Sequence, residues 1–305
     1  MRRFLLLAMS AAVSAAGGCR SAKTDDSGAL KVLMIGNSFS ISCLRHLPQV
    51  AQGCGVYLDL ASLYISGCSM ERHWSNVEKA DADPSFRPYR FDRYVKGVLV
   101  EKSSRNIQEA LKSAAWDVVT IQQASHLSFR KETYVPFGDN LVAAVRRYAP
   151  QARIVLQETW SYTPWDSRLA KWKIGQDEMY ALLHSAYGEF AARHGLRIIP
   201  MGTAVQEWRR RLPVKYTENS FGGDVAGGRG QAPQDQFKRT ADNRWTPNCD
   251  LFHLNGRGEY FQALVWAASL FDGVDLSKLA YRPDFVTENE AKLMREIAME
   301  LGKAR

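Results

Sequence analysis

The sequence lacks the motifs of several common kinds of site. It has no His-Glu-x-x-His and no paired Cys-x-x-Cys, and its six histidines are scattered along the chain. A metal site therefore has little support. No Gly-x-Gly-x-x-Gly follows the first apolar run, which argues against a bound dinucleotide. We expect neither a metal nor another cofactor.

Charge clusters are also scarce. The 305 residues carry a formal charge of +8, but only Arg209, Arg210 and Arg211 form a tight basic cluster. The cluster lies in a segment of helical period and has only Trp208 beside it as a stacking aromatic. A solvated helix face explains it better than a nucleic-acid interface, so we expect no nucleic-acid partner.

A third absence is a hydrophobic run long enough to span a bilayer, which takes about 20 apolar residues. The apolar stretch at 4–13 is shorter, a basic M-R-R start precedes it, and three small residues lead to Cys19. This pattern resembles a bacterial lipoprotein signal over residues 1–19 with Cys19 lipidated, the alternative being a plain secretory signal. We expect an exported, membrane-anchored lipoprotein, periplasmic or at the cell surface, with residues 20–30 as a polar tether.

In the rest of the chain, apolar runs of strand length alternate with longer segments of helical period. Such alternation favours parallel strands joined by helical crossovers. We therefore predict a single α/β domain over 31–305, a three-layer α/β/α sandwich on a five-stranded parallel sheet of flavodoxin-like order. Strands are predicted at 32–35, 56–64, 117–122, 154–157 and 197–199. Helices are predicted at 42–52, 106–115, 134–148, 167–194, 255–271 and 287–301.

Two segments interrupt this alternation. Residues 81–97 are predicted to be an insertion between the second and third strands, and residues 213–249 a longer, glycine-rich insertion. Loops of that length in compact domains are usually functional or disordered. We interpret the second segment as a flap over the site, with disorder as the alternative.

Ser38 stands where the first predicted strand ends and a helix begins, in the stretch I-G-N-S-F-S. Ligands bind at this end of the strands in a doubly wound sheet. A serine hydroxyl needs an adjacent base to act as a nucleophile, usually a histidine oriented by a carboxylate. Asp250 precedes His253 by three residues, a spacing that lets the carboxylate reach the imidazole. By itself, the serine turn could instead cap a helix or bind phosphate through backbone amides.

Three pieces of sequence together resemble the SGNH, or GDSL-like, hydrolase superfamily: G-N-S at 36–38, Gly67 after the second strand, and Asp250-x-x-His253. Its members are mostly esterases and lipases, and some deacetylate carbohydrates. The resemblance implies that Ser38 is the nucleophile and that His253 is the general base, oriented by Asp250. It also implies that the backbone amides of Ser38 and Gly67 contribute to an oxyanion hole.

One block departs from the superfamily pattern. Such enzymes usually carry Gly-x-Asn-Asp after the third strand, where this chain reads I-Q-Q-A-S-H at residues 121–126. Direct alignment puts His126 in the place of the asparagine, and Gln123 is a rival because its side chain also ends in an amide. Both are candidates for the third oxyanion donor. The Gln-Gln-x-Ser combination resembles a bacterial branch of the superfamily whose members are mostly uncharacterised.

Four cysteines remain if Cys19 is lipidated, and an exported protein can keep disulfides. Cys68 and Cys249 each lie beside a motif expected to line one pocket, so a bridge between them is one prediction. Free buried cysteines are the alternative.

Aromatic residues follow the fourth predicted strand at Trp160, Tyr162 and Trp165, and Trp245 lies in the predicted flap. Flat aromatic faces suit a sugar ring, although burial in the core is the better explanation for any single one. The candidate substrate contacts are Trp160, Trp165, Trp245 and Asn37.

The predicted function is hydrolysis of short acyl esters, above all acetyl, by a Ser-His-Asp triad. The expected partner is a small-molecule or glycan ester, because no continuous apolar groove for a long acyl chain is evident. One alternative is a non-catalytic glycan-binding surface lipoprotein on the same fold, which the altered third block favours. Another is a phosphate- or nucleotide-binding flavodoxin-like domain, which requires that no imidazole lie near residues 36–40.

Overall fold

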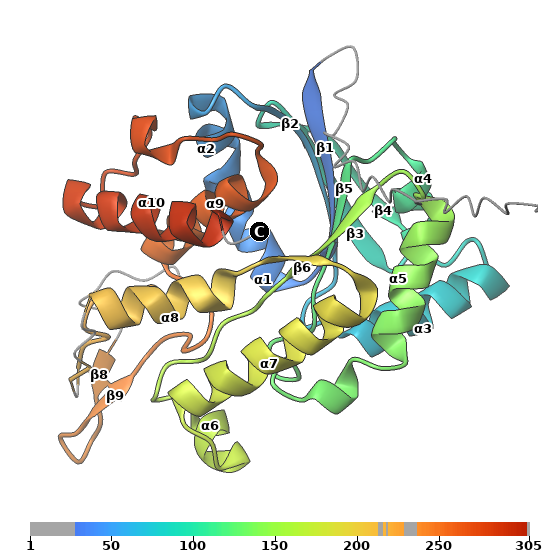
Figure 1. Cartoon of the computed structure of the whole chain (residues 1–305). Helices are drawn as coiled ribbons and strands as arrows, with labels where there is room; N and C mark the ends of the chain where they lie inside the picture. The colour runs from blue at the N-terminus through green and yellow to red at the C-terminus, as the bar shows by residue number, and fades with distance from the viewer. Residues whose placement is uncertain (1–27, 213–215, 218, 229–236, 304–305) are drawn as a thin grey trace, which may run out of the picture.

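The computed structural model describes residues 28–212, 216–217, 219–228 and 237–303. Its centre is a seven-stranded sheet in the order β4-β3-β2-β1-β5-β6-β7 (Figure 1). The strands of this sheet are β1 Ala29–Gly36, β2 Tyr57–Tyr64, β3 Tyr89–Val95, β4 Val98–Arg105, β5 Val118–Ile121, β6 Arg153–Gln157 and β7 Arg197–Ile199.

Five of these strands are parallel and lie in the predicted flavodoxin-like order, β2-β1-β5-β6-β7. The central strand β1 is buried almost throughout, as expected for a parallel strand that is covered on both faces. Leu33 of β1 pairs with Ala61 of β2 on one side and with Val119 of β5 on the other. The carboxyl ends of β1, β2 and β5 therefore meet at one edge, where the predicted motifs lie.

The prediction of a five-stranded sheet is wrong at the β2 edge, where β3 and β4 add an antiparallel hairpin. This hairpin contains much of the predicted 81–97 insertion. Tyr89 and Phe91 are buried on one side of β3 and Arg90 is exposed on the other, as in a strand with one face on the core. A further contact is the side-chain pair of Arg93 with Asp59 of β2, at 2.5 Å.

Helices cover both faces of the sheet. In Figure 1, α2, α9 and α10 lie on one side of the sheet and α3, α4 and α5 on the other. The α-helices are α1 Ser38–Ile41, α2 Leu47–Gly53, α3 Met70–Ala82, α4 Ile107–Lys112, α5 Phe137–Tyr148, α6 Ser167–Trp172, α7 Gln176–His194, α8 Met201–Arg211, α9 Gly256–Leu270 and α10 Glu288–Lys303. Short 3-10 helices are η1 Ser42–Arg45, η2 Lys131–Thr133 and η4 Leu276–Lys278.

The helix predicted at 167–194 is two helices, α6 and α7. Lys173 adopts a left-handed conformation with a φ of 61° and ends α6, and Gly175 is the N-cap of α7. The long predicted helix was wrong because a continuous apolar period does not reveal a left-handed residue.

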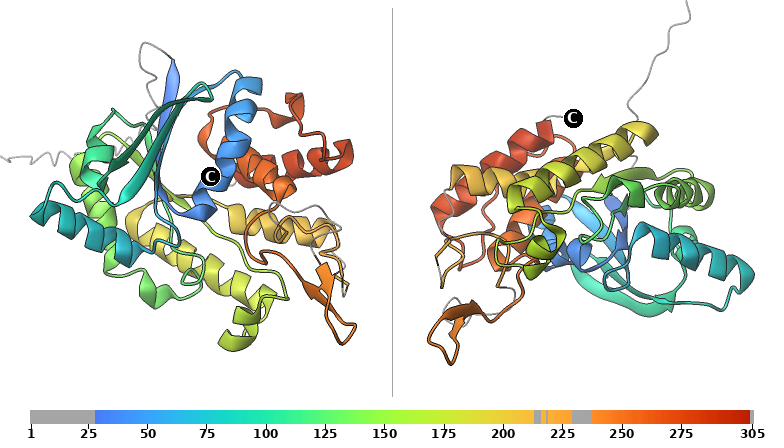
Figure 2. Two further views of the ribbon diagram at one scale, coloured as in Figure 1. Left: turned by 180° about the vertical axis from the view of Figure 1, so that it is seen from behind. Right: turned by 90° about the horizontal axis from the view of Figure 1, so that it is seen from below.

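The predicted insertion at 213–249 is described in part. Its end contains a separate antiparallel hairpin, β8 Phe237–Arg239 and β9 Trp245–Pro247, which projects from the body of the fold in both views of Figure 2. Residues 229–236 lie outside the described part. The predicted flap thus includes a projecting hairpin, whereas Asp224, Val225 and Ala226 of the same segment are buried in the fold.

The predicted signal and Cys19 lie outside the described residues. Ala29 already belongs to β1, so the predicted tether over 20–30 reaches at most residue 28. Within the described ranges, no helix is long and apolar enough to cross a bilayer.

The predicted bridge between Cys68 and Cys249 is wrong, because both cysteines are free. Different neighbours hold the two thiols. Cys68 is fully buried next to Tyr89, whereas Cys249 lies against the backbone of Gly228. Burial raises the pKa of the Cys68 thiol to about 12, so this cysteine is a core residue rather than a reactive one.

Candidate active site

Ser38 is the first residue of α1, directly after the turn that follows β1. Asn37 caps this helix, since its Oδ1 accepts the Phe39 amide at 3.0 Å. Gly36 leaves room for the turn, because a Cβ there would lie 2.4 Å from Ser40 Oγ. The sequence G-N-S therefore fixes where the serine hydroxyl stands.

Asn37 joins the ends of three strands. Its Nδ2 donates to the Cys68 carbonyl after β2 at 3.0 Å, and its Oδ1 also accepts from Gln122 Nε2 after β5 at 2.7 Å. It is 1% exposed. Asn37 was predicted as a substrate contact, and it does line the pocket described below, but these hydrogen bonds already occupy its amide.

The structure brings Ser38, His253 and Asp250 together. His253 Nε2 lies 2.7 Å from Ser38 Oγ, and its Nδ1 is hydrogen-bonded to Asp250 Oδ2. The other carboxylate oxygen of Asp250 accepts the amides of Phe252 at 2.9 Å and His253 at 2.8 Å. This order of groups orients the imidazole so that it can take the serine proton. An imidazole beside the turn also argues against the phosphate-binding alternative.

The pKa of Asp250 is below its usual value. Burial raises it, but the hydrogen bonds from the His253 side chain and from the two backbone amides lower it by more. The carboxylate is therefore charged throughout the neutral range, where it stabilises a protonated imidazole.

Hydrogen bonds from three backbone amides and one indole N–H hold all four carbonyls of the loop from Asp250 to His253. The donors come from two segments, one after β6 and one before the β8–β9 hairpin. The pairs are Gly228 N to Asp250 O at 2.8 Å, Thr163 N to Leu251 O at 3.1 Å, Trp160 Nε1 to Phe252 O at 2.8 Å and Gly227 N to His253 O at 2.8 Å. We call this loop with its donors the clamped loop.

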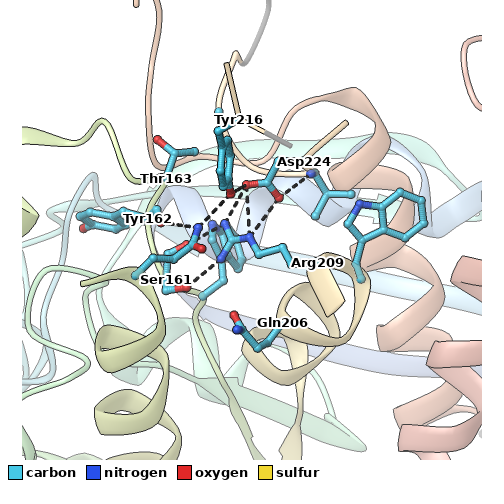
Figure 3. Close-up of polar contacts among 12 residues, drawn as sticks. Ser161, Tyr162, Thr163, Gln206, Arg209, Tyr216 and Asp224 are labelled. Carbon is cyan, nitrogen blue, oxygen red and sulfur yellow. Dashed lines mark hydrogen bonds and ion pairs between the residues drawn. The ribbon is translucent and has the colours of Figure 1, made fainter. Parts of the chain in front are cut away.

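A buried ion pair ties the two donor segments to each other (Figure 3). Arg209 of α8 bonds Asp224 through Nη2 at 2.9 Å and Ser161 Oγ through Nη1 at 2.7 Å. Tyr216 adds a bond to Asp224 at 2.7 Å. The side chains of Arg209 and Asp224 are 6% and 0% exposed, so the predicted solvated helix face is wrong for Arg209 and holds for the exposed Arg210.

Ser38 and Gly67 form a second wall of the pocket, distinct from the clamped loop. Among the described residues, neither backbone N–H has a hydrogen-bond acceptor. Gly67 has a φ of +59° in a turn after β2, a conformation that glycine adopts without strain. Both residues line the pocket, so the two amides are available to a developing oxyanion.

The two candidates for the third donor differ in the structure. Gln123 is fully buried: its Oε1 accepts the Met70 amide at 3.0 Å and its Nε2 donates to the Thr133 carbonyl at 3.0 Å. Its side chain therefore holds the loop after β5 to α3 and does not line the pocket. His126 is exposed and lines the pocket. Burial, together with the charges of Arg168 and Arg130, lowers the pKa of His126.

None of the three predicted tryptophan contacts lines the pocket. Trp160 is fully buried and stacks on Phe39 with ring centroids 4.1 Å apart. Trp165 packs edge-on against other aromatic rings, and Trp245 lies on the projecting β9 strand. These residues serve packing, and the simpler explanation from core burial holds for Trp160.

The pocket has a volume of about 210 Å³. Six of its residues were not among the predicted site residues: Phe39, Ser66, Ser125, Tyr162, Arg168 and Phe252. The Tyr162 hydroxyl lies 2.8 Å from Ser125 Oγ. The D-S-R stretch at 166–168 was the available signal, because an aspartate at a helix N-cap can hold an arginine two residues on. The residues that line the pocket are Asn37, Ser38, Phe39, Ser66, Gly67, Ser125, His126, Tyr162, Arg168, Phe252 and His253.

A larger hollow of about 440 Å³ lies between the ends of α9 and α10. Its described lining includes Asp275 and Lys303 but no serine, cysteine or histidine, so we assign no reaction to it. Over the described ranges, no group of three or more histidine, cysteine or acidic side chains could hold a metal ion.

A family model described as a domain of unknown function, DUF4886, matches residues 31–224, more than half of the chain. The chain belongs to the DUF4886 family. The matched range includes Ser38 and Gly67 and ends before Asp250. The crystal structure of a DUF4886 family protein from Bacteroides uniformis is similar, with 26% identity and a TM-score of 0.71 over 89% of this chain and 94% of that one.

More distant solved structures are also similar to this DUF4886 chain. A member of the lipolytic G-D-S-L family from Veillonella parvula has 14% identity and a TM-score of 0.43, covering 81% of this chain and all of that one, 100%. A family 3 carbohydrate esterase from Clostridium thermocellum has 12% identity and a TM-score of 0.41, covering 78% and 94%. The chain is similar to these proteins, in line with the predicted resemblance to SGNH hydrolases, but similarity this low carries nothing about activity or superfamily membership. No curated protein matches the chain.

Proposed function

We propose that this chain is a serine ester hydrolase that removes short acyl groups. One observation carries the proposal: Ser38 Oγ lies 2.7 Å from His253 Nε2, and Asp250 holds the far side of the same imidazole. A serine, a base and an orienting carboxylate in this order are the constellation of acyl-transfer catalysis.

The proposed reaction has two halves. In the first, Ser38 Oγ attacks the ester carbonyl carbon while His253 Nε2 takes the serine proton. The amides of Ser38 and Gly67 bind the oxyanion, and His253 returns the proton to the alcohol as the carbon–oxygen bond to it breaks. In the second, His253 deprotonates a water that attacks the acyl-serine, and His253 returns this proton to Ser38 Oγ as the acyl–oxygen bond breaks and the acid leaves. His126 is the candidate third donor to the oxyanion, since it lies at the pocket while Gln123 is engaged elsewhere.

The small pocket supports a short acyl group, for which we propose acetyl. At about 210 Å³ it is below the usual range for drug-sized ligands, roughly 300–1,000 Å³. Ser66, Gly67 and His126 at its mouth are exposed, so the alcohol part of the ester can extend outward. The hydroxyl and imidazole groups of this mouth suit a carbohydrate, which we propose as that alcohol.

Replacing the nucleophile tests the proposal. Ser38→Ala should lower kcat for p-nitrophenyl acetate by about 10⁴- to 10⁶-fold, because the attacking oxygen is lost. Ser185→Ala is the matched control, since this serine is exposed on α7 and its hydroxyl donates to Glu189. A fluorophosphonate probe should label the wild type and the control but not Ser38→Ala. Equal hydrolysis by Ser38→Ala and the wild type would refute the assignment.

The same probe separates the alternative of a non-catalytic glycan-binding protein. A site of that kind need not keep a reactive serine, so the wild type would stay unlabelled while it bound a glycan. The alternative rests on the altered third block, where Gln123 is used for packing.

We further propose that the chain is exported and anchored through a lipid on Cys19. Incorporation of a clickable fatty-acid analogue tests this. The label should appear on the wild type and be absent from Cys19→Ser, and a wild type without label would contradict the anchor.

A further inference from the structure

The pocket has one charged side chain in its lining besides the histidines, and that charge is positive. Arg168 lines it, and no aspartate or glutamate does so among the described residues. Asp250 and Asp166 lie behind His253 and Arg168. A ligand in this pocket therefore meets a guanidinium first.

Contacts within the protein hold the Arg168 side chain in one position at the pocket. Its Nε donates to Asp166 Oδ1 at 2.8 Å and its Nη2 to Asp166 Oδ2 at 2.5 Å. Its guanidinium carbon lies 4.0 Å from the ring centre of Phe252 and 4.3 Å from that of Tyr162. Since packing and pairing fix the side chain in advance, little conformational entropy is lost when it binds a ligand.

The pairing with Asp166 leaves donors on Arg168. A guanidinium has five N–H groups, and Asp166 engages one on Nε and one on Nη2. No described residue accepts from Nη1. The edge formed by Nη1 and Nη2 therefore has two parallel donors, which match the two oxygens of a carboxylate.

The arginine is also open to the outside of the pocket. Its side chain is 34% exposed, so a group on an alcohol part that extends outward can reach it. His126, the neighbouring residue of the lining, has a lowered pKa and carries little charge at neutral pH. Among the residues that line the pocket, the fixed positive charge is thus that of Arg168.

We propose that Arg168 binds a carboxylate on the alcohol part of the ester, so that the preferred substrates are short acyl esters of acidic sugars or other hydroxy acids. This inference rests on the proposed ester hydrolysis and names its substrate class. Arg168 is a specificity residue in it and takes no part in the proton transfers.

A matched pair of substrates tests the inference. We expect acetate release from O-acetylated galacturonic acid to exceed that from O-acetylated galactose by about 10- to 100-fold in kcat/KM, the range for a hydrogen bond to a charged group. In Arg168→Gln the ratio should fall to within about threefold of one. Arg193→Gln is the matched control, because Arg193 forms the same two-point pair with an aspartate, Asp139, on another face. It should keep the wild-type ratio.

A binding measurement separates failure of this inference from failure of the proposed function. In the Ser38→Ala background, NMR titration should detect binding of galacturonate but not of galactose, and Arg168→Gln should abolish it. A labelled, active wild type with no preference between the two esters overturns the inference and leaves the hydrolase standing. An unlabelled, inactive wild type that still binds galacturonate through Arg168 supports the anion site and refutes the hydrolase. Arg168→Lys, which keeps the charge but not the fork, should retain part of the preference, and thermal unfolding checks that each variant folds.

Discussion

The two walls of the candidate active site differ in how the protein holds them. On one wall, all four carbonyls from Asp250 to His253 accept hydrogen bonds, and a buried ion pair ties their donors together. On the other wall, the exposed Gly67 has a backbone amide without an acceptor in the described part of the chain.

The difference follows from what each wall would do. A base must be aligned with its nucleophile before the ester arrives, and that alignment comes from bonds within the protein. Amides that receive an oxyanion must instead stay unbonded until the transition state forms, so their own turn has to hold them without using them. Rigidity is therefore built into one wall by hydrogen bonds and into the other by the left-handed turn at Gly67.

The largest effect should come from breaking the clamped wall at its carboxylate. Asp250→Asn should lower kcat by about 10⁴-fold, because the amide favours the wrong tautomer of His253 and cannot stabilise the imidazolium. Asp139→Asn is the control, because Asp139 pairs with His194 at a distance of 2.7 Å and this pair lies away from the site. Steady-state hydrolysis of p-nitrophenyl acetate measures both. A loss of less than tenfold in Asp250→Asn would contradict the proposed role.

Removing the buried ion pair that holds the donors of the clamped loop should mainly reduce stability. Arg209→Met leaves Asp224 buried without its cation and should lower the free energy of unfolding by about 3–5 kcal/mol. Arg210→Met, at the exposed neighbour, should change it by less than about 0.5 kcal/mol. Urea denaturation gives both values. Equal stability of the two variants would mean that the pair does not hold the clamped loop.

Activity should be sensitive to a change in the turn at Gly67. Gly67→Ala should lower kcat by about 10²- to 10³-fold, because a side chain at positive φ shifts the amide that would bind the oxyanion. Gly55→Ala is matched: its φ is +72°, and at both positions the added carbon meets no atom within 4 Å. The two variants should lose similar stability in thermal unfolding, but only Gly67→Ala should lose activity. Equal activity in both would remove Gly67 from the oxyanion hole.

Much of the fold could be predicted because the parallel strands are local, continuous apolar runs. All five were predicted in the observed order. The β3–β4 hairpin was not, since its first strand follows D-P-S-F-R-P and alternates charged with aromatic residues, which obscures the apolar pattern. A strand at the edge of a sheet needs only one apolar face, so its signal is weaker.

The candidate site likewise has residues whose roles the sequence predicts and residues whose roles it does not. Asp250 and His253 are three residues apart, and local geometry predicts that they meet; the structure adds Ser38 from the far end of the chain. The role of Gln123 could not be predicted, because its partners Met70 and Thr133 are remote in sequence. The tryptophans were wrongly predicted as substrate contacts, because proximity to a strand end does not tell which way a ring points.

The hydroxyl of Ser38 and the imidazole of His253 are separated by 215 positions along the chain. A polypeptide emerging from the ribosome consequently carries the proposed nucleophile long before the proposed base, and the two meet only after both segments have docked. Recovery of the proposed hydrolysis during refolding should therefore trail recovery of helical circular dichroism, which would make it a late and stringent indicator of complete folding.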